Sequence, residues 1–142
     1  MDFMSMVTDR FLPFVAAYGI SLREVGPSDV IAYSPRITLW VFAGREGLDV
    51  SCVKKADDGK WYEYPMGPFL VKRSKPGPKS VLEVGDEREA RLGAELQSYA
   101  AALASDCADV LRGESGWMSE YPWTPIRVAG PLAKTLDELD VV

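Results

Sequence analysis

The side chains that could do chemistry in this sequence are limited first by what is missing. The chain contains no histidine, which is the commonest general base and metal ligand near neutral pH. It has two cysteines, Cys52 and Cys107, too few for a zinc site of cysteine and histidine and too far apart in sequence to indicate a redox pair. We therefore expect two reduced core cysteines, and a protein that is not an enzyme and uses no metal or cofactor.

Two spacings do resemble reactive patterns. Ser51 and Lys54 match Ser-x-x-Lys, in which a lysine activates a serine, but that chemistry uses the first turn of a helix. The pair falls in a predicted strand, where residues three apart point to opposite faces. Asp106 and Asp109 lie three apart in a predicted helix, where paired carboxylates can do acid–base work, although a solvated helix face usually carries such residues. Both patterns favour structural roles.

Aromatic and acidic side chains alternate near the C-terminus, and this cluster is the most informative one. Tryptophan and tyrosine beside carboxylates have the composition of a protein-contact hot spot. The same rings could instead cover the second apolar face of a sheet, made by Trp40 and Phe42, and both interpretations stay open from sequence alone. The predicted partner-binding residues are Asp106, Asp109, Glu114, Trp117, Glu120, Tyr121 and Trp123.

Charge is distributed unevenly along the chain. Residues 1–82 carry a net charge of +2 and residues 83–142 a net charge of −7, which gives −5 overall. An acidic half disfavours contact with a phosphate backbone and suits a positively charged protein partner. We expect no direct nucleic acid ligand, and the sequence does not indicate an oligomeric state.

Length and composition are those of an ordinary globular chain. The 142 residues, with 47% apolar and 26% charged, fit one domain with a core of useful size. The longest apolar run is far shorter than the roughly 18 residues of a membrane-spanning helix, and the N-terminus lacks the pattern of an export signal. We expect a single domain over residues 1–142 that is cytoplasmic and has no membrane contact.

The elements that would position these residues begin with a helix within residues 1–19, where apolar residues step by three and four. Pro13 either kinks this helix or shortens it to a start near Asp9, a plausible N-cap. Residues 20–72 then alternate with period two between glycine and proline turns, which predicts an antiparallel meander. The predicted strands are Ile20–Val25, Val30–Tyr33, Ile37–Ala43, Leu48–Lys54, Trp61–Tyr64 and, as a possible sixth, Phe69–Lys72.

Three further segments follow the sheet. We expect a basic loop over residues 73–85, a long helix over residues 86–113 and an aromatic, proline-rich tail over residues 114–142. Asp86 and Glu89 resemble a capping box at the start of the long helix, and Gly113 ends it. The predicted fold class is therefore α+β: an antiparallel meander sheet of five or six strands, with a short N-terminal helix and one long helix of the C-terminal half packed on it. Both faces of Ile37–Ala43 are apolar, so each face needs a cover.

Two stretches carry a resemblance to a known family. The first runs from Phe11-Leu12-Pro13-Phe14 through Tyr18-Gly19-Ile20 and Val30–Leu39 to Arg45-Glu46, and the second runs from Leu96 to Glu114. They resemble small bacterial immunity-type proteins of secreted toxin systems, in which a short helix leads to a meander and a further helix closes the fold. The resemblance implies an immunity protein that neutralises a cognate toxin by occluding its active site. Its partner would be a basic toxin domain that acts on nucleic acid or nucleotides, since such enzymes need a basic cleft.

Two other functions stay open. A chaperone or adaptor for a secretion-system effector would share the acidic surface but hold its client partly unfolded. A small histidine-free hydrolase that depends on aspartate is the third possibility. The neighbouring genes would separate the three, because an immunity protein accompanies a large secreted toxin, a chaperone accompanies secretion machinery and an enzyme accompanies metabolic genes.

Overall fold

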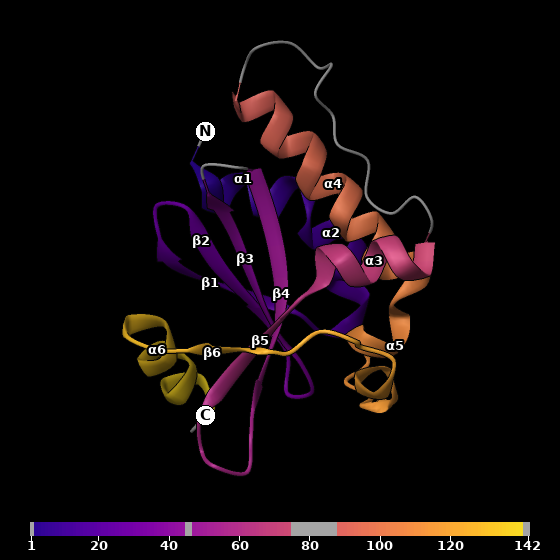
Figure 1. Cartoon of the computed structure of the whole chain (residues 1–142). Coiled ribbons are helices and arrows are strands. Elements are labelled where there is room, and N and C mark those ends of the chain that lie inside the picture. Colours follow the sequence, from indigo (N-terminus) through magenta and orange to yellow (C-terminus); the bar gives the residue numbers. More distant parts are fainter. Residues whose placement is uncertain (1, 45–46, 75–87, 141–142) are drawn as a thin grey trace.

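Six strands form one antiparallel sheet in the computed structural model, which describes residues 2–44, 47–74 and 88–140. The strands lie side by side in their order along the chain (Figure 1). Their bounds are β1 (Ser21–Gly26), β2 (Asp29–Tyr33), β3 (Thr38–Gly44), β4 (Gly47–Lys55), β5 (Trp61–Pro65) and β6 (Ile126–Val128). The predicted α+β fold with a meander sheet is confirmed.

The sixth strand comes from the C-terminal tail. β6 pairs with β5, with Ile126 opposite Glu63 and Val128 opposite Trp61. Between these two strands the chain forms α3 (Met66–Ser74), α4 (Arg88–Asp106), α5 (Ala108–Leu111) and the 3-10 helix η2 (Gly116–Ser119). The tail, which we predicted only as an aromatic, proline-rich segment, therefore supplies the sixth strand of the sheet.

The prediction of a strand at Phe69–Lys72 is wrong, because these residues belong to α3. Met66, Phe69 and Leu70 are fully buried, and their spacing by three and four is that of one helix face. Pro68 is tolerated because the first helical turn needs no backbone donor at that position. The predicted basic loop begins inside this helix at Arg73, and its residues 75–85 lie outside the described residues.

The N-terminal helix is divided into α1 (Phe3–Arg10), α2 (Leu12–Val15) and the 3-10 helix η1 (Ala16–Tyr18). Asp2, and not Asp9, caps α1, since its Oδ1 accepts a hydrogen bond from Ser5 N at 2.7 Å. The break falls just before Pro13, which is the kink expected of a proline. Gly19 ends the segment at φ 74°, a conformation that glycine adopts without strain.

The predicted long helix is interrupted at Cys107, whose φ of −128° and ψ of 35° are not helical. Its first part, α4, buries Leu92, Leu96 and Leu103 along one stripe. Gly93 does not break the helix, and a Cβ there would make only ordinary contact with the Arg10 side chain, 3.7 Å from its Nε. The predicted cap Asp86 lies outside the described residues.

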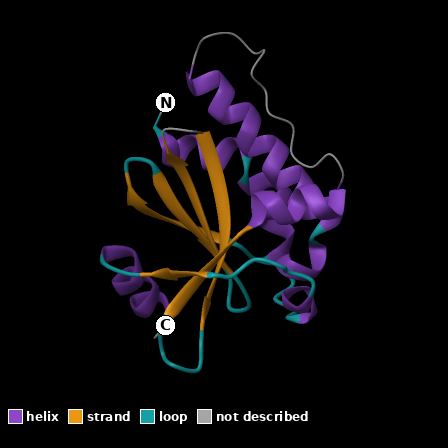
Figure 2. Ribbon diagram, viewed as in Figure 1, coloured by secondary structure: helices purple, strands orange, loops and turns teal. Residues whose placement is uncertain are grey.

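Each face of the sheet carries its own hydrophobic core. The helices from α1 to η2 pack on one face in a core that includes Leu39, Val41 and Cys52. The last helix, α6 (Pro131–Asp140), packs on the opposite face, where Leu132 and Leu136 join a smaller core. Figure 2 shows α6 apart from the other helices. One face of β3 is therefore covered by the larger core, whereas α6 covers only part of the other face, where Trp40 and Phe42 stay partly exposed. No helix in the described ranges is long and apolar enough to cross a bilayer.

Candidate functional site

The aromatic residues predicted to bind a partner differ in exposure. Trp117 is only 1% exposed and Tyr121 is also buried, and both belong to the larger core on the helix side of the sheet. Tyr121 Oη donates to Pro65 O at 2.9 Å, and the Trp117 ring lies against Phe69 of α3. These two rings are therefore core cover, but on the face opposite Trp40 and Phe42. The tail passes beside α3 before it crosses to β6, which explains the difference.

Trp123 is the exposed member of that aromatic group. Its side chain is 42% exposed, and its ring meets the Tyr121 ring edge-on at a centroid distance of 5.2 Å. Of the three predicted rings, Trp123 is thus the one whose surface can reach a partner without unfolding.

Arg73 on α3 brings two of the predicted carboxylates together. Its Nη1 and Nη2 donate to the two carboxylate oxygens of Asp109 at 2.7 and 2.9 Å, and Nη2 also donates to Glu120 Oε2 at 2.8 Å. The guanidinium lies 4.6 Å from the centre of the Phe69 ring. Hydrogen bonds from Arg73 hold the pKa of Asp109 below its usual range, and Asp109 in turn raises the pKa of Arg73. We call these four residues the Arg73 cluster.

The remaining predicted carboxylates also have neighbours in the chain. Glu114 Oε2 accepts from Arg112 Nε at 2.6 Å in an exposed pair. Asp106 lies at the end of α4, where Ser105 Oγ donates to its Oδ2 at 3.0 Å. Because Arg73 and Arg112 neutralise the carboxylates beside them, the C-terminal surface presents less unbalanced negative charge than its sequence indicates.

The candidate nucleophiles are in unreactive surroundings. Burial raises the pKa of Cys52 to about 12 and that of Cys107 to about 11, so both are neutral thiols near pH 7. Ser51 and Lys54 lie in β4, as predicted, and their positions three apart on a strand place them on opposite faces. Among the described residues no group of three or more His, Cys, Asp or Glu side chains could hold a metal ion.

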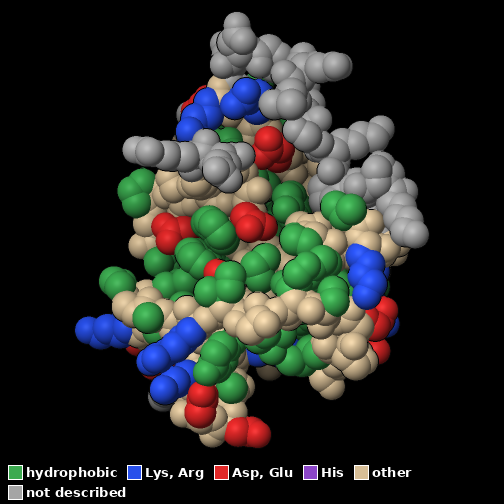
Figure 3. Space-filling view, in the orientation of Figure 1, with side chains coloured by type: hydrophobic (Ala, Val, Ile, Leu, Met, Phe, Trp, Pro, Cys, Tyr) green, Lys and Arg blue, Asp and Glu red, His purple; other side chains and the backbone are tan. Residues whose placement is uncertain are grey.

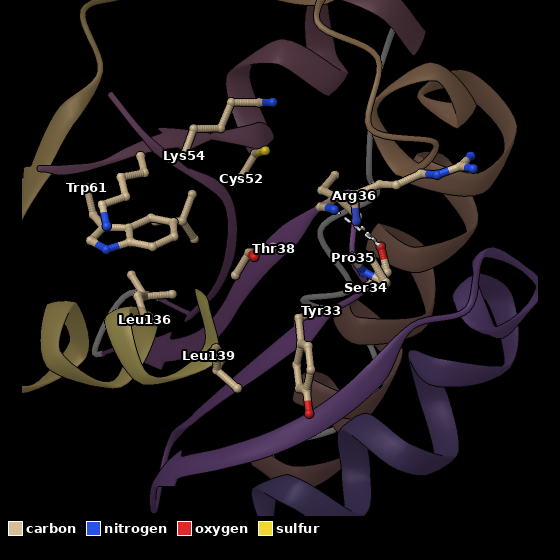
Figure 4. A pocket seen from close by; sticks show the side chains of 13 residues that line it. Tyr33, Ser34, Pro35, Arg36, Thr38, Cys52, Lys54, Trp61, Leu136 and Leu139 are labelled. Carbon is tan, nitrogen blue, oxygen red and sulfur yellow. Dashed lines mark hydrogen bonds between the residues drawn. The ribbon is translucent and has the colours of Figure 1, made fainter. Parts of the chain in front are cut away.

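A pocket of about 440 Å³ lies beyond the start of β3, between the β2–β3 turn, the end of β4 and α6 (Figure 4). Trp61, Leu136 and Leu139 supply apolar walls. Ser34 Oγ accepts from the backbone N of Arg36 and Ile37, both at 3.2 Å, and so holds the turn. The Arg36 guanidinium points away from the pocket in Figure 4. The described residues that line it include no carboxylate, so they offer no acid–base pair.

A second candidate group of side chains, which sequence reasoning missed, lies on the sheet face opposite the main core. Trp40 is directly opposite Ser51 and Phe42 is directly opposite Asp49 across β3 and β4, and Glu63 of β5 points to the same side. The Trp40 and Phe42 rings stack with centroids 4.1 Å apart. We call these five residues the acidic patch. Polar residues at alternate positions of two otherwise apolar strands were the signal that could have found it.

Electrostatics distinguish the acidic patch from the rest of the surface. Burial and the charge of Asp49 raise the pKa of Glu63, and burial raises the pKa of Asp49 against a hydrogen bond from Val50 N. Tyr99 Oη donates to Asp49 Oδ1 at a long 3.4 Å. Within the part of the chain that the structure describes, no ion pair includes either carboxylate. Neither carboxyl group therefore has a cation of the described chain as its partner.

Three polar atoms of the patch are buried and find no hydrogen-bond partner among residues 2–44, 47–74 and 88–140: Trp40 Nε1, Ser51 Oγ and Glu63 Oε2. The patch continues into a hollow of about 470 Å³ that is lined by Phe42, Asp49 and Tyr99 among others. Figure 3 views the sheet from the side opposite α1 and α2, and hydrophobic side chains gather over its middle with acidic side chains among them. The arrangement suits recognition of a cationic group, because aromatic faces and carboxylates both attract one.

No protein-family model matches this sequence, and no curated protein and no solved structure matches the chain.

Proposed function

We propose that this protein is an immunity-type inhibitor that binds a basic toxin domain and occludes its active site, the toxin being one that acts on nucleic acid or nucleotides. The observation that carries the proposal is the acidic patch, where two carboxylates without a basic partner in the described residues lie beside a stacked aromatic pair. Aromatic rings are enriched at protein-contact sites, and an acidic group beside them complements a basic partner.

Occlusion is favoured over chemistry by the state of the reactive groups. The two thiols are neutral near pH 7. The Ser51 hydroxyl has the carboxylate of Glu63 as its neighbour, and Lys54, the lysine of the Ser-x-x-Lys pattern, lies on the opposite face of β4. The overall charge of −5 adds long-range attraction for a basic partner and speeds association.

The surface that we propose is the acidic patch and not the C-terminal residues alone. Asp109, Glu120 and Glu114 have their charges balanced by arginines of the same chain. A carboxylate that already has a partner gains little from a second cation, whereas an unpaired and partly buried one gains more. Trp123 remains as a possible contact at the edge of the interface.

The test begins with the gene next to this one. If it encodes a secreted protein with a toxic C-terminal domain, that folded domain should bind the purified full chain and lose its activity. Glu63→Lys should weaken this binding by on the order of 100-fold, because a lysine replaces an unpaired carboxylate at the contact. Glu24→Lys makes the same charge change at an exposed position of β1 and should leave affinity almost unchanged.

The proposal is contradicted if the folded domain is not bound or if the two lysine variants lose affinity equally. Binding that requires the unfolded domain would indicate a chaperone instead.

A further inference from the structure

We infer that the acidic patch is a receptor site for one arginine side chain from a basic peptide segment of the partner, with the guanidinium over the Trp40–Phe42 ring pair and its N–H groups donating to Asp49 and Glu63. The inference rests on the proposed function, because it names the chemical group that the proposed surface would hold. It follows from the atoms left without partners and from a matching arrangement elsewhere in the same molecule.

Ser51 shows that the site is more than a set of surface carboxylates. Its side chain is 0% exposed, yet Oγ has no hydrogen-bond partner. The register places it opposite Trp40 and between Asp49 and Val53 on one side of β4, so it faces the same region as both carboxylates. A buried polar atom without a partner is unfavourable. The patch is therefore polar at its base as well as at its rim.

The inventory of hydrogen-bonding groups indicates what is missing. Asp49 and Glu63 together offer four carboxylate oxygens, and an ionised carboxylate can only accept. The hydrogen-bond donors to them are Val50 N and the hydroxyl of Tyr99, both on Asp49 Oδ1. The Ser51 hydroxyl lies near enough to Glu63 to lower the pKa of that carboxyl, but the two do not have the geometry of a hydrogen bond. Acceptors exceed donors, so a group with several N–H donors and a positive charge complements the site.

A peptide segment also brings acceptors. The buried Nε1 of Trp40 is a donor without a partner, and a guanidinium cannot accept its hydrogen bond. The carbonyl groups next to an arginine in a peptide can. An arginine within a peptide can therefore bond both the acceptor oxygens and the unpaired N–H donor of the patch. A free inorganic cation could bind only the acceptor oxygens.

The Arg73 cluster is an internal example of the same chemistry. There, one guanidinium donates to both oxygens of Asp109 and to Glu120 and lies 4.6 Å from the Phe69 ring centre. The acidic patch repeats two carboxylates from separate elements and an aromatic surface, but without the arginine. A planar guanidinium can stack on a ring and make paired hydrogen bonds, whereas an ammonium group cannot. Arginine is therefore preferred to lysine.

The experiment uses the full chain and the peptide acetyl-Gly-Arg-Gly-amide as the probe. Indole N–H signals of the four tryptophans are followed by NMR, and Trp40→Phe identifies the Trp40 signal. The probe should shift the Trp40 signal saturably while the signal of buried Trp117 stays in place. The peptide with citrulline in place of arginine has the same shape without the charge and should give no saturable shift.

Two variants test the carboxylates. Glu63→Gln and, separately, Asp49→Asn should each weaken binding of the arginine peptide by about tenfold, because each removes a charged acceptor. Glu24→Gln is the matched control, and the unchanged Trp117 signal shows that each variant is folded. The inference is overturned if arginine and citrulline peptides shift Trp40 equally, if neither shifts it, or if both patch variants bind as well as the original chain.

Failure here is distinguishable from failure of the proposed function. If the toxin domain binds and Glu63→Lys abolishes that binding while the arginine peptide has no effect, the partner surface stands and the arginine anchor is wrong. If the arginine peptide binds as expected while no neighbouring toxin domain does, the anchor site stands and the immunity function is wrong.

Discussion

The Arg73 cluster and the acidic patch contain similar side chains, but the pKa values of their carboxyl groups shift in opposite directions. Each combines two carboxylates from different elements with an aromatic surface. Hydrogen bonds from Arg73 lower the pKa of Asp109, whereas burial raises the pKa of Asp49 and of Glu63. From this difference we infer that carboxylates paired with a cation of their own chain stabilise the fold. Carboxylates left without one are the groups that the proposed partner would contact.

The largest expected change in the free energy of unfolding concerns the C-terminal tail, which contacts Arg73 of α3 through Glu120. Trp117→Ala should destabilise the protein by about 3–5 kcal/mol, because it empties a fully buried site in the larger core. Denaturant titration measures this free energy of unfolding. Trp123→Ala is the matched control and should cost far less, since that ring is 42% exposed. If the two variants lost equal free energy of unfolding, the distinction between a buried Trp117 and an exposed Trp123 would be wrong.

The next effect separates a structural arginine from a surface one. Arg73→Met should cost about 2 kcal/mol at neutral pH, because it leaves Asp109 and Glu120 as neighbouring charges without their shared donor. Arg112→Met removes an exposed ion pair with Glu114 and should be close to neutral. The two variants are compared by denaturant titration.

Acidification should reduce the difference in the free energy of unfolding between Arg73→Met and the original chain. The folded-state pKa of Asp109 is depressed, so its contribution is present above the unfolded pKa and is lost as pH falls through the folded pKa. A cost of Arg73→Met that persists unchanged in acid would show that packing on Phe69, and not the ion pair, stabilises this region.

The smallest effect has the opposite sign. Glu63→Gln should slightly stabilise the protein at neutral pH, because the raised folded-state pKa of Glu63 means that its ionisation disfavours the folded state. In the original chain, ionisation of Glu63 does not destabilise the folded state below the unfolded-state pKa of this group. The destabilisation develops as pH rises and is complete above the folded-state pKa. The gain from Glu63→Gln should therefore vanish in acid. A loss of stability at neutral pH would mean that the carboxylate has a stabilising role.

Local patterns predicted most of the sheet. The five strands from β1 to β5 lie within about one residue of their predicted bounds, because alternation and turn residues specify them locally. β6 has three residues and depends on pairing with β5, so its own sequence holds little signal. The apolar run at Phe69–Lys72 is short enough to fit a strand or a helix, and only its burial with Met66 decides for α3.

The candidate site was harder to predict because it depends on residues far apart in sequence. Asp109 and Glu120 belong to one predicted group of partner-binding residues. The structure brings both to Arg73, which lies 36 residues before Asp109 and which the sequence did not connect with them. Asp49 lies opposite Phe42 and Glu63 lies opposite Val53, so only the folded sheet brings these two single polar residues to one face. Composition predicted that this chain has an acidic surface for a partner. Which carboxylates remain without an ion pair depends on contacts that only the fold creates.

The most direct test of the central claim compares the same substitution in the two regions. Affinity for the cognate toxin domain is measured for Glu63→Gln and for Glu120→Gln, each of which removes one negative charge and keeps the shape of the side chain. The account predicts that Glu63→Gln weakens binding by about tenfold and that Glu120→Gln leaves it unchanged. Weaker binding for Glu120→Gln with no change for Glu63→Gln would contradict the account and place the partner on the C-terminal surface.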